Sequence, residues 1–375
     1  MTARNIFKIL HTEAAPGWGG QEIRILQEST WLAGKGHRVF ILCRPDSEIH
    51  SRYSRRSIPN LSIHAIPFQW TLDPGDILKI FKFIRKEGVD IVHTHSSIDS
   101  WTASIAAKLA GVPIVRSRHV SIPIKDFFPR NLVYRLPDRI IASGKRIAEM
   151  VSGLKTVSKD NVVSIPAGIN PERFRPGIDG SSFREEAGVP KDAFLIGKVA
   201  VIRGWKGHMD FIAAAEIVLR KTPNVIFVIV GDGPGFERVK NAIRSKGLEK
   251  AVIMTGYRED IPAVMNALDV LVLASTSGEA TSQVIPQAWA CKRCVLATEA
   301  GGITDIVRHG ENGYLVPPGD PGRMADGLLQ LMESSELRNR LAEAGHSFAV
   351  KHLTEGEMME KTLSVYRELS RRSQE

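Results

Sequence analysis

Residues 194–202, FLIGKVAVI, and residues 224–235, NVIFVIVGDGPG, decide the fold class of this sequence. Each is a run of apolar residues that leads into a glycine-containing loop, and a helical pattern from about His208 to Arg220 lies between them. Strand runs this apolar are typical of parallel sheets that are buried on both faces. The strand, helix, strand order therefore predicts an α/β fold with helices on both faces of a parallel sheet.

The same alternation of strands and helices runs through the rest of the chain. The other apolar runs are NIFKIL, RVFILC, DIVH, PIVRS and RIIAS in the first half, and AVIMTG, DVLVLAS and CVLAT in the second. A chain of 375 residues is longer than the ~250–300 residues at which single cores stop growing. We therefore expect two doubly wound domains.

The boundary between these domains is predicted from the stretch SIPAGINPERFRPGIDG, which is rich in proline and glycine. Beyond the second domain, Thr354 and Glu357 have the spacing of a capping box and precede an amphipathic stripe. The predicted organisation is an N-terminal domain (1–170), a linker (171–182), a C-terminal domain (183–353), and a helix (354–375) that packs back on the first domain.

Composition indicates the class of protein and its compartment. No uninterrupted run of 18 apolar residues is present, and MTARNIFKIL lacks the apolar core of a signal peptide, so a cytoplasmic protein is expected. Three cysteines cannot close a disulfide framework, and the lone pair Cys291 and Cys294 lacks further zinc ligands. The net charge of +9 suits an anionic partner, and we expect no nucleic acid.

Loops that follow the strands are the expected ligand sites, because open parallel sheets bind ligands at the carboxyl ends of their strands. In AAPGWGGQE, Gly19 and Gly20 allow close backbone approach at a helix start, although a tight turn without a ligand is the alternative. In RGWKGH, Arg203 and Lys206 are two cations that can hold a diphosphate. GDGPG resembles a dinucleotide fingerprint only weakly, and we interpret it as a turn.

A fourth loop, GEATSQVIPQAWAC at 278–291, combines a carboxylate, a turn and a helix start. Glu279 lies at a strand end and can accept hydrogen bonds from sugar hydroxyls, whereas a solvated carboxylate is the alternative. The predicted helix from Gln283 to Ala290 directs its N-terminus at phosphate and carries Gln287 within reach of a ribose diol. No Asp-x-Asp and no His/Asp cluster with metal spacing is expected after a strand in either half.

The ordered motifs GGQE, RGWKGH, GDGP, GYRED, STSGEATSQVIPQAWA, AGGITDIV and ENGYLVPPGDP resemble the retaining glycosyltransferases of family 4, over about residues 5 to 370. The resemblance implies the GT-B fold, with two Rossmann-like domains that face each other across a cleft. It also implies a nucleotide-diphospho-sugar donor, with a UDP-sugar expected, and no metal or other cofactor. The second domain would hold this donor and the first the acceptor.

The resemblance also assigns roles to residues. It implies catalytic roles for Arg203, Lys206, Glu279 and His119; donor binding by Gly19, Gly20, Gly256, Tyr257, Ala280, Thr281, Ser282, Gln283 and Gln287; and acceptor binding by His95 and Arg118. The family's paired glutamates map onto Glu279 and Gln287, so an amide replaces the second carboxylate. Ala280 replaces a glycine, which would carry roughly 1 kcal/mol of strain if that position needed a positive φ, and would shift donor preference.

His119 matches a histidine that lies near the reacting sugar in the family. In the front-face mechanism the departing phosphate oxygen takes the acceptor proton, so we expect His119 to bind a donor hydroxyl rather than abstract a proton. A purely structural histidine is the alternative.

The acceptor is inferred from SIPIKDFFPRNLVYR at 121–135, in which cations alternate with apolar and aromatic residues. This mixture predicts a surface that rests on the inner face of an anionic membrane, with inward packing as the alternative. The cations are Lys125, Arg130 and Arg135, and the apolar partners are Phe127, Phe128, Leu132 and Tyr134. With the resemblance, this predicts a hexosyl- or heptosyltransferase acting on a cell-envelope glycan or glycolipid such as lipopolysaccharide core. A sugar epimerase or phosphorylase of the same fold, and a degenerate nucleotide-sugar-binding protein, remain as alternatives.

Overall fold

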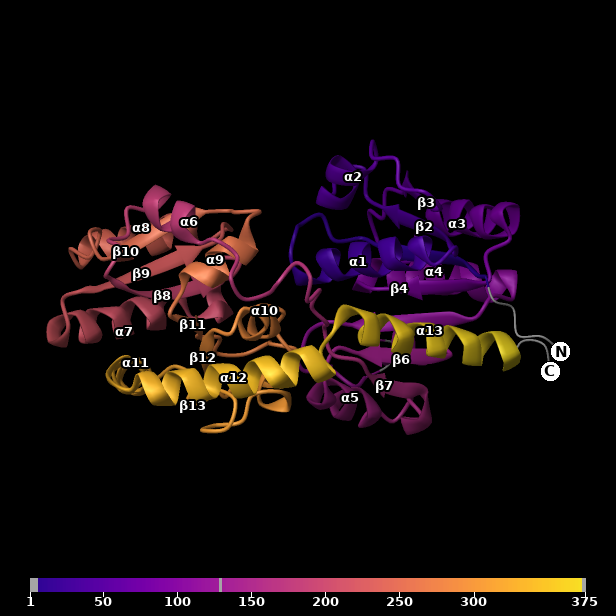
Figure 1. Ribbon diagram of the computed structural model, residues 1–375. Coiled ribbons are helices and arrows are strands. Elements are labelled where there is room, and N and C mark those ends of the chain that lie inside the picture. Colours follow the sequence, from indigo (N-terminus) through magenta and orange to yellow (C-terminus); the bar gives the residue numbers. More distant parts are fainter. Residues whose placement is uncertain (1–5, 128–129, 373–375) are drawn as a thin grey trace. The chain divides into compact units, whose positions relative to one another are not determined.

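The computed structural model describes residues 6–127 and 130–372, which form two compact units (Figure 1). Unit 1 comprises residues 1–166 and 358–375, and unit 2 comprises residues 167–357. Residues 171–182, predicted as a linker, therefore lie inside unit 2. The reason is that Phe174 is buried in the core of unit 2, while backbone hydrogen bonds join Ile169 to Leu353 and Glu355.

Unit 1 is built on a seven-stranded parallel sheet with the order β3-β2-β1-β4-β5-β6-β7. Its strands are β1 (Lys8–Glu13), β2 (Arg38–Cys43), β3 (Leu61–Ala65), β4 (Ile91–Thr94), β5 (Ile114–Arg118), β6 (Arg139–Ala142) and β7 (Val162–Ser164). Its helices are α1 (Gly20–Gly34), α2 (Glu48–Tyr53), α3 (Pro74–Glu87), α4 (Ser97–Ala110), α5 (Lys145–Ser152) and most of α13 (Glu355–Arg372).

Helix α13 begins where the capping-box spacing places it, because the Thr354 hydroxyl accepts a hydrogen bond from the Glu357 amide at 3.2 Å. Its apolar stripe, which includes Met359 and Leu363, packs with Ile9 and Ile91 on one face of the unit 1 sheet. Figure 1 shows α13, in yellow, running along this face. Helices α3 and α4 cover the opposite face.

Unit 2 is built on a six-stranded parallel sheet with the order β10-β9-β8-β11-β12-β13. Its strands are β8 (Phe194–Val199), β9 (Val225–Val230), β10 (Val252–Gly256), β11 (Val270–Leu273), β12 (Cys294–Thr298) and β13 (Tyr314–Val316). Its helices are α6 (Ser181–Glu186), α7 (His208–Lys221), α8 (Phe236–Ser245), α9 (Ile261–Ala267), α10 (Val284–Ala290), α11 (Pro321–Glu333) and α12 (Ser335–His352).

The strand order of both sheets is that of a Rossmann fold, in which the chain reverses its direction of travel between the first and fourth strands. This switch point lies between β1 and β4 in unit 1 and between β8 and β11 in unit 2. Ligands of open parallel sheets bind beyond the carboxyl ends of the strands at such points. The topology therefore selects the loops after β1, β4, β8 and β11 as candidate sites.

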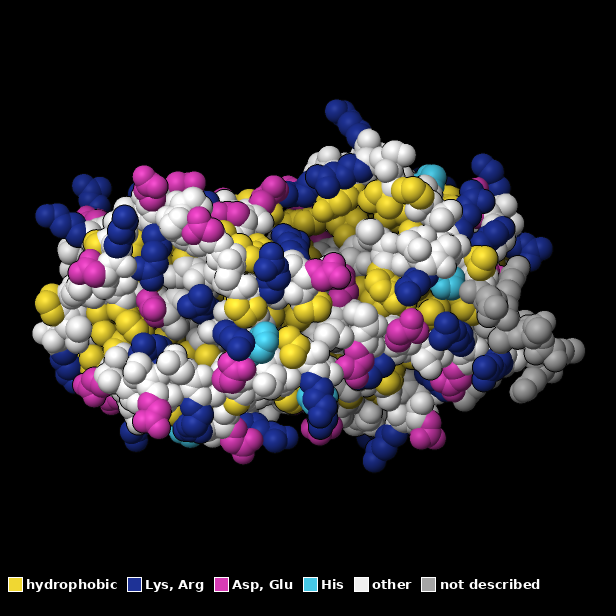
Figure 2. All heavy atoms as spheres, viewed as in Figure 1, with side chains coloured by type: hydrophobic (Ala, Val, Ile, Leu, Met, Phe, Trp, Pro, Cys, Tyr) yellow, Lys and Arg dark blue, Asp and Glu magenta, His cyan; other side chains and the backbone are white. Residues whose placement is uncertain are grey.

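Charged side chains of both signs are interspersed over the face of the molecule in Figure 2. Within the described residues, no helix combines the length and the apolar character that crossing a membrane requires.

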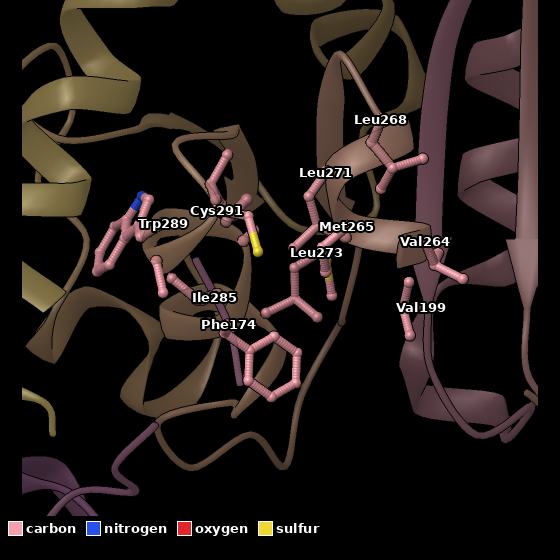
Figure 3. Packing of buried hydrophobic residues seen from close by; sticks show 14 of the residues in the cluster. Phe174, Val199, Val264, Met265, Leu268, Leu271, Leu273, Ile285, Trp289 and Cys291 are labelled. Carbon is pink, nitrogen blue, oxygen red and sulfur yellow. The ribbon is translucent and has the colours of Figure 1, made fainter. Parts of the chain in front are cut away.

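The core that supports the loop after β11 is shown in Figure 3, where α9 and α10 pack on Leu271 and Leu273 of β11. Trp289 of α10 is fully buried, and its ring meets Phe348 of α12 edge to face at a centroid distance of 5.9 Å. Gly345 permits this approach, because a Cβ there would lie 2.3 Å from the Trp289 ring. Packing thus fixes α10 firmly beside the loop that precedes it.

The cysteines are free and buried. Burial raises the pKa of the Cys291 thiol to about 11 and that of Cys294 to about 12. Both side chains are therefore protonated thiols that fill the core, which agrees with a structural role for this pair.

Candidate functional site

The loops that follow β8 and β11 are joined at the switch point of unit 2. The Thr276 amide donates a hydrogen bond to the Trp205 carbonyl at 2.8 Å. Gly207, with φ +65°, packs so tightly that a Cβ would lie 1.7 Å from the Ala274 carbonyl oxygen. Because no other residue type fits at position 207, the glycine of RGWKGH fixes one loop against the other.

Lys206 and Glu279 form an ion pair across these two loops. The Ser275 hydroxyl donates a 2.6 Å hydrogen bond to the same carboxylate oxygen, Oε1. The backbone amide of Gly302, after β12, donates to the Glu279 carbonyl at 2.9 Å, so a third loop supports the site. Glu279 is 5% exposed, which places a carboxylate and a partly buried cation together where three strands end.

The second carboxylate oxygen of Glu279, Oε2, has no hydrogen-bond donor among the residues that the structure describes. It is therefore available to a ligand hydroxyl, while Lys206 can turn toward a ligand anion. Arg203 does not join this pair. Its side chain is exposed, and the guanidinium lies 5.6 Å from the Trp205 ring centroid.

Helix α10 begins at Val284, one residue later than predicted, and has seven residues. Gln287 on α10 is half-buried, and its side-chain amide makes no hydrogen bond within the described chain. Ala280 is not among the non-glycine residues with positive φ in the described ranges, which are Asn60, Phe68, Leu72 and Lys292. The condition for strain at Ala280 is therefore not met, because the left-handed turn falls on Gly278 (φ +73°).

The remaining predicted donor residues of unit 2 surround this point in different ways. Gly256 ends β10 with φ +73°, and its carbonyl accepts from the Gly231 amide at 2.8 Å. Tyr257 is 48% exposed, whereas Thr281 is buried and its hydroxyl accepts from the Ala167 amide at 3.5 Å. Ser282 and Gln283 are half-buried in the turn before α10.

A chain of hydrogen bonds between histidine rings lies at the switch point of unit 1. His11 Nδ1 is 2.9 Å from His95 Nε2, and His95 Nδ1 is 3.2 Å from His119 Nε2. His119 Nδ1 in turn contacts the Ser143 hydroxyl at 3.2 Å. Sequence analysis identified His95 and His119 but missed His11, whose signal is a polar ring at the end of an apolar strand.

Burial keeps these rings neutral. It lowers the pKa of His11 to about 3 and holds the pKa values of His95 and His119 well below the ordinary value. Both ring nitrogens of His119 have protein partners, so a sugar hydroxyl must replace one of these contacts to bind it. His93 bonds instead to the hydroxyls of Tyr366 (2.6 Å) and Ser117 (2.8 Å).

His11, His93 and His95 have ring nitrogens within 4.8 Å of one another, a spacing that can hold a metal ion. Sequence spacing alone did not reveal this cluster, because His11 and His93 come together through the pairing of β1 with β4. The rings, however, lie stacked or tilted against one another, with centroids 4.3 to 5.2 Å apart, and His11 bonds directly to His95. A metal needs lone pairs that converge on one point about 2.0–2.1 Å away, so this arrangement favours hydrogen bonding.

Acidic side chains surround the glycine-containing loop after β1. The buried Glu13 carboxylate accepts hydrogen bonds from the Ala15 amide at 2.7 Å and from the Gln21 amide group. Burial, together with Asp99 and Glu22, raises the pKa of Glu13 well above its usual range. The raised pKa favours the protonated carboxyl group, which can donate a hydrogen bond to a ligand near Gly19 and Gly20 at the start of α1.

Arg118 is held within unit 1, since it donates to the Tyr134 hydroxyl and to the Ile122 carbonyl, both at 2.6 Å. Tyr134 is 6% exposed and packs under the Arg116 guanidinium. The prediction that Tyr134 faces a membrane is therefore wrong, because its ring packs inward. Ile122, Lys125, Phe127 and Arg135 are exposed, whereas Phe128 and the Arg130 side chain lie outside what the structure describes.

Comparisons with known proteins show the fold and the family of this chain. The chain is 25% identical to the Escherichia coli UDP-Gal:alpha-D-GlcNAc-diphosphoundecaprenol alpha-1,3-galactosyltransferase, covering 88% of this chain and 89% of that protein. A glycosyltransferase structure from Rickettsia africae superposes with a TM-score of 0.87 at 21% identity, covering 98% and 99% of the two chains. Anabaena HepE in complex with UDP-glucose gives a TM-score of 0.82 at 21% identity, covering 96% and 100%.

Two family models match, one to each half of the chain. Residues 18–173 match Glycosyltransferase Family 4, and residues 179–348 match Glycosyl transferases group 1. Together these segments contain the loops after β4, β8 and β11 and the end of the loop after β1. The chain therefore belongs to the glycosyltransferases of family 4, with the two Rossmann-like units of the GT-B fold.

Proposed function

We propose that this glycosyltransferase moves a sugar, with retention and without a metal, from a UDP-sugar to a glycolipid or glycan acceptor of the cell envelope. The observation that carries the proposal is the Lys206–Glu279 pair at the switch point of unit 2. The Escherichia coli relative, which is named for a UDP-Gal donor and a lipid-diphosphate acceptor, supports both substrate classes. The UDP-glucose bound to Anabaena HepE supports the donor further.

In this mechanism the sugar carbon breaks its bond to the diphosphate oxygen and forms a bond to the acceptor oxygen on the same face. Lys206 stabilises the charge that develops on the leaving diphosphate, assisted by Arg203. Glu279 Oε2 accepts hydrogen bonds from the sugar, and Gln287 binds the ribose diol with one acceptor and two donors. The acceptor proton passes to the departing phosphate oxygen, so His11, His95 and His119 need not act as bases.

The proposal is tested first by thermal shift with a panel of nucleotide sugars, because selective binding raises the melting temperature. The ligand found is then incubated with a lipid-linked sugar acceptor, and the anomeric configuration of the product is read by NMR. We expect a retained configuration. Release of free UDP and a modified sugar without acceptor would indicate an epimerase, and binding without turnover would indicate a degenerate binding protein.

Activity is expected to survive EDTA, because Lys206 and Arg203 supply the counter-charge that a metal provides in other transferases. Turnover is measured after dialysis against chelator, with and without added Mn²⁺, and bound metal is quantified in the same sample. Loss of activity that Mn²⁺ restores would contradict the prediction and would direct attention to His11, His93 and His95.

We further propose that the segment around Lys125 and Phe127 binds an anionic membrane surface. Each Lys or Arg near such a surface contributes about 1 kcal/mol, and the exposed Ile122 and Phe127 add apolar contact. Binding is expected to weaken as salt rises, since exposed charges are screened within ~8 Å at physiological ionic strength.

Co-sedimentation with phosphatidylserine vesicles checks this binding for the wild type and for a Lys125/Arg130/Arg135→Ser variant. A Lys82/Arg85/Lys86→Ser variant removes three exposed cations from α3 and serves as the matched control. Equal binding of the first variant and the wild type would refute the membrane surface.

A further inference from the structure

Lys198 is a fully buried lysine that sequence analysis passed over, although its signal was a charged residue inside the apolar run FLIGKVAVI. It lies on β8 with 0% exposure, and no described residue forms a hydrogen bond with its amino group. His208, the first residue of α7, is 3% exposed, and its ring lies against the backbone of Arg203 without a hydrogen bond of good geometry. An unpartnered amine is therefore buried, together with a buried imidazole, where β8 meets the start of a 14-residue helix.

An unpaired buried amine is costly, so its presence at this place needs a reason. The charged groups that act on Lys198 are Lys206 and Glu279, which form the proposed diphosphate site, and Asp210 in the first turn of α7. The positive end of the α7 dipole also disfavours a cation here. Burial, followed by Lys206, lowers the pKa of Lys198 to about 7, while Glu279 and Asp210 act in the opposite direction.

His208 does not compete for a proton under these conditions. Burial, with Lys198 and Lys206, lowers its pKa to about 3, so the ring is neutral at physiological pH. Asp210 is half-buried, and burial raises the pKa of its carboxyl group. Lys198 is thus the group whose protonation changes when a charged ligand binds beside Lys206.

We propose that Lys198 takes up a proton from solvent when the donor diphosphate binds beside Lys206, and so becomes an additional cation beneath the leaving group. The inference rests on the proposed function, because it needs a diphosphate at the loop after β8. The proposal also supplies a further positive charge to the site, since Arg203 lies exposed on its loop and Lys206 is already paired with Glu279. In the free protein the buried Lys198 amine need not carry a permanent charge, and in the donor complex it supplies a positive charge to the site.

The direction in which donor affinity changes with pH follows from the charges. A bound anion stabilises the protonated amine, so it raises the pKa of Lys198 above its value in the free protein. Donor affinity is therefore highest below about pH 7, where Lys198 is already charged. It falls by up to about tenfold per pH unit as pH rises toward the pKa of the complex. At pH 8 binding is accompanied by uptake of up to about one proton.

The test is isothermal titration at pH 8 with the nucleotide sugar selected by the thermal-shift panel, in several buffers that differ in ionisation enthalpy. A nucleotide sugar is used because the terminal phosphate of UDP itself titrates near pH 6. The slope of binding enthalpy against buffer enthalpy gives the number of protons taken up. We expect most of one proton for the wild type and none for Lys198→Met.

Three further variants sharpen this test. Lys198→Arg stays charged at every accessible pH, so it is expected to bind the donor without proton uptake and without loss of affinity at high pH. Lys221→Met removes an exposed lysine from the other end of α7 and is expected to match the wild type. His208→Gln is expected to retain the uptake.

Equal proton uptake in the wild type and Lys198→Met, or loss of uptake in His208→Gln, would overturn the assignment to Lys198. Donor binding by the wild type without proton uptake would overturn this inference alone. Failure of every nucleotide sugar to bind would overturn the proposed function and this inference with it.

Discussion

Replacing Lys206 with alanine is expected to lower turnover by roughly 10²–10³, the scale for removing one preorganised electrostatic stabiliser from a transition state. The substitution removes the cation that faces the leaving diphosphate, and it leaves the buried Glu279 carboxylate with Ser275 as its remaining partner. Arg203→Ala is expected to reduce turnover in the same range, through the second cation of this loop.

Steady-state and single-turnover rates with the selected nucleotide sugar would measure these effects. Arg220→Ala is the matched control, because it removes a largely exposed cation from α7 with the backbone of the site unchanged. Near-normal rates in both Lys206→Ala and Arg203→Ala would exclude these residues from the mechanism.

Glu279→Gln is expected to reduce transfer at least tenfold more than Gln287→Glu does, again on the scale of a transition-state electrostatic contact. The first substitution removes the charge that holds Lys206 and weakens the acceptor for sugar hydroxyls. The second changes a half-buried amide that makes no hydrogen bond within the described chain, and either side chain can accept from a ribose diol.

Kinetics on both variants, together with their melting temperatures, would check this ranking. The double variant Lys206→Ala/Glu279→Gln should lose about as much activity as the worse single variant, because residues that act as a unit are not additive. A larger loss for Gln287→Glu than for Glu279→Gln would refute the assignment of roles at the donor site.

The elements of both sheets could be predicted from local sequence. The helix expected from about His208 to Arg220 is α7 (His208–Lys221). Apolar runs that end in glycine loops, and helical periodicity between them, are properties of neighbouring residues. The family followed from the order of such loops, which a single chain displays without its fold.

The sequence predicted that the catalytic candidates lie at strand ends. It grouped Lys206 with Arg203, whereas in the structure Lys206 forms an ion pair with Glu279. Lys206 and Glu279 are 73 residues apart in the sequence, and their contact depends on β8 and β11 being neighbours in the sheet. The same holds for His11 and His93, which face each other through the register of β1 and β4. Strand order depends on the whole sheet, so it cannot be predicted from a local sequence pattern.

The linker prediction failed for a related reason. Proline and glycine content indicates an irregular backbone, and residues 171–182 are largely irregular, yet Phe174 anchors them in the core of unit 2. Periodicity thus determined the fold class, and the order of the loop motifs indicated the family and the loops that carry the chemistry. Tertiary structure alone decided which charges meet and which remain buried without a partner, because contact and burial depend on packing between segments far apart in the chain.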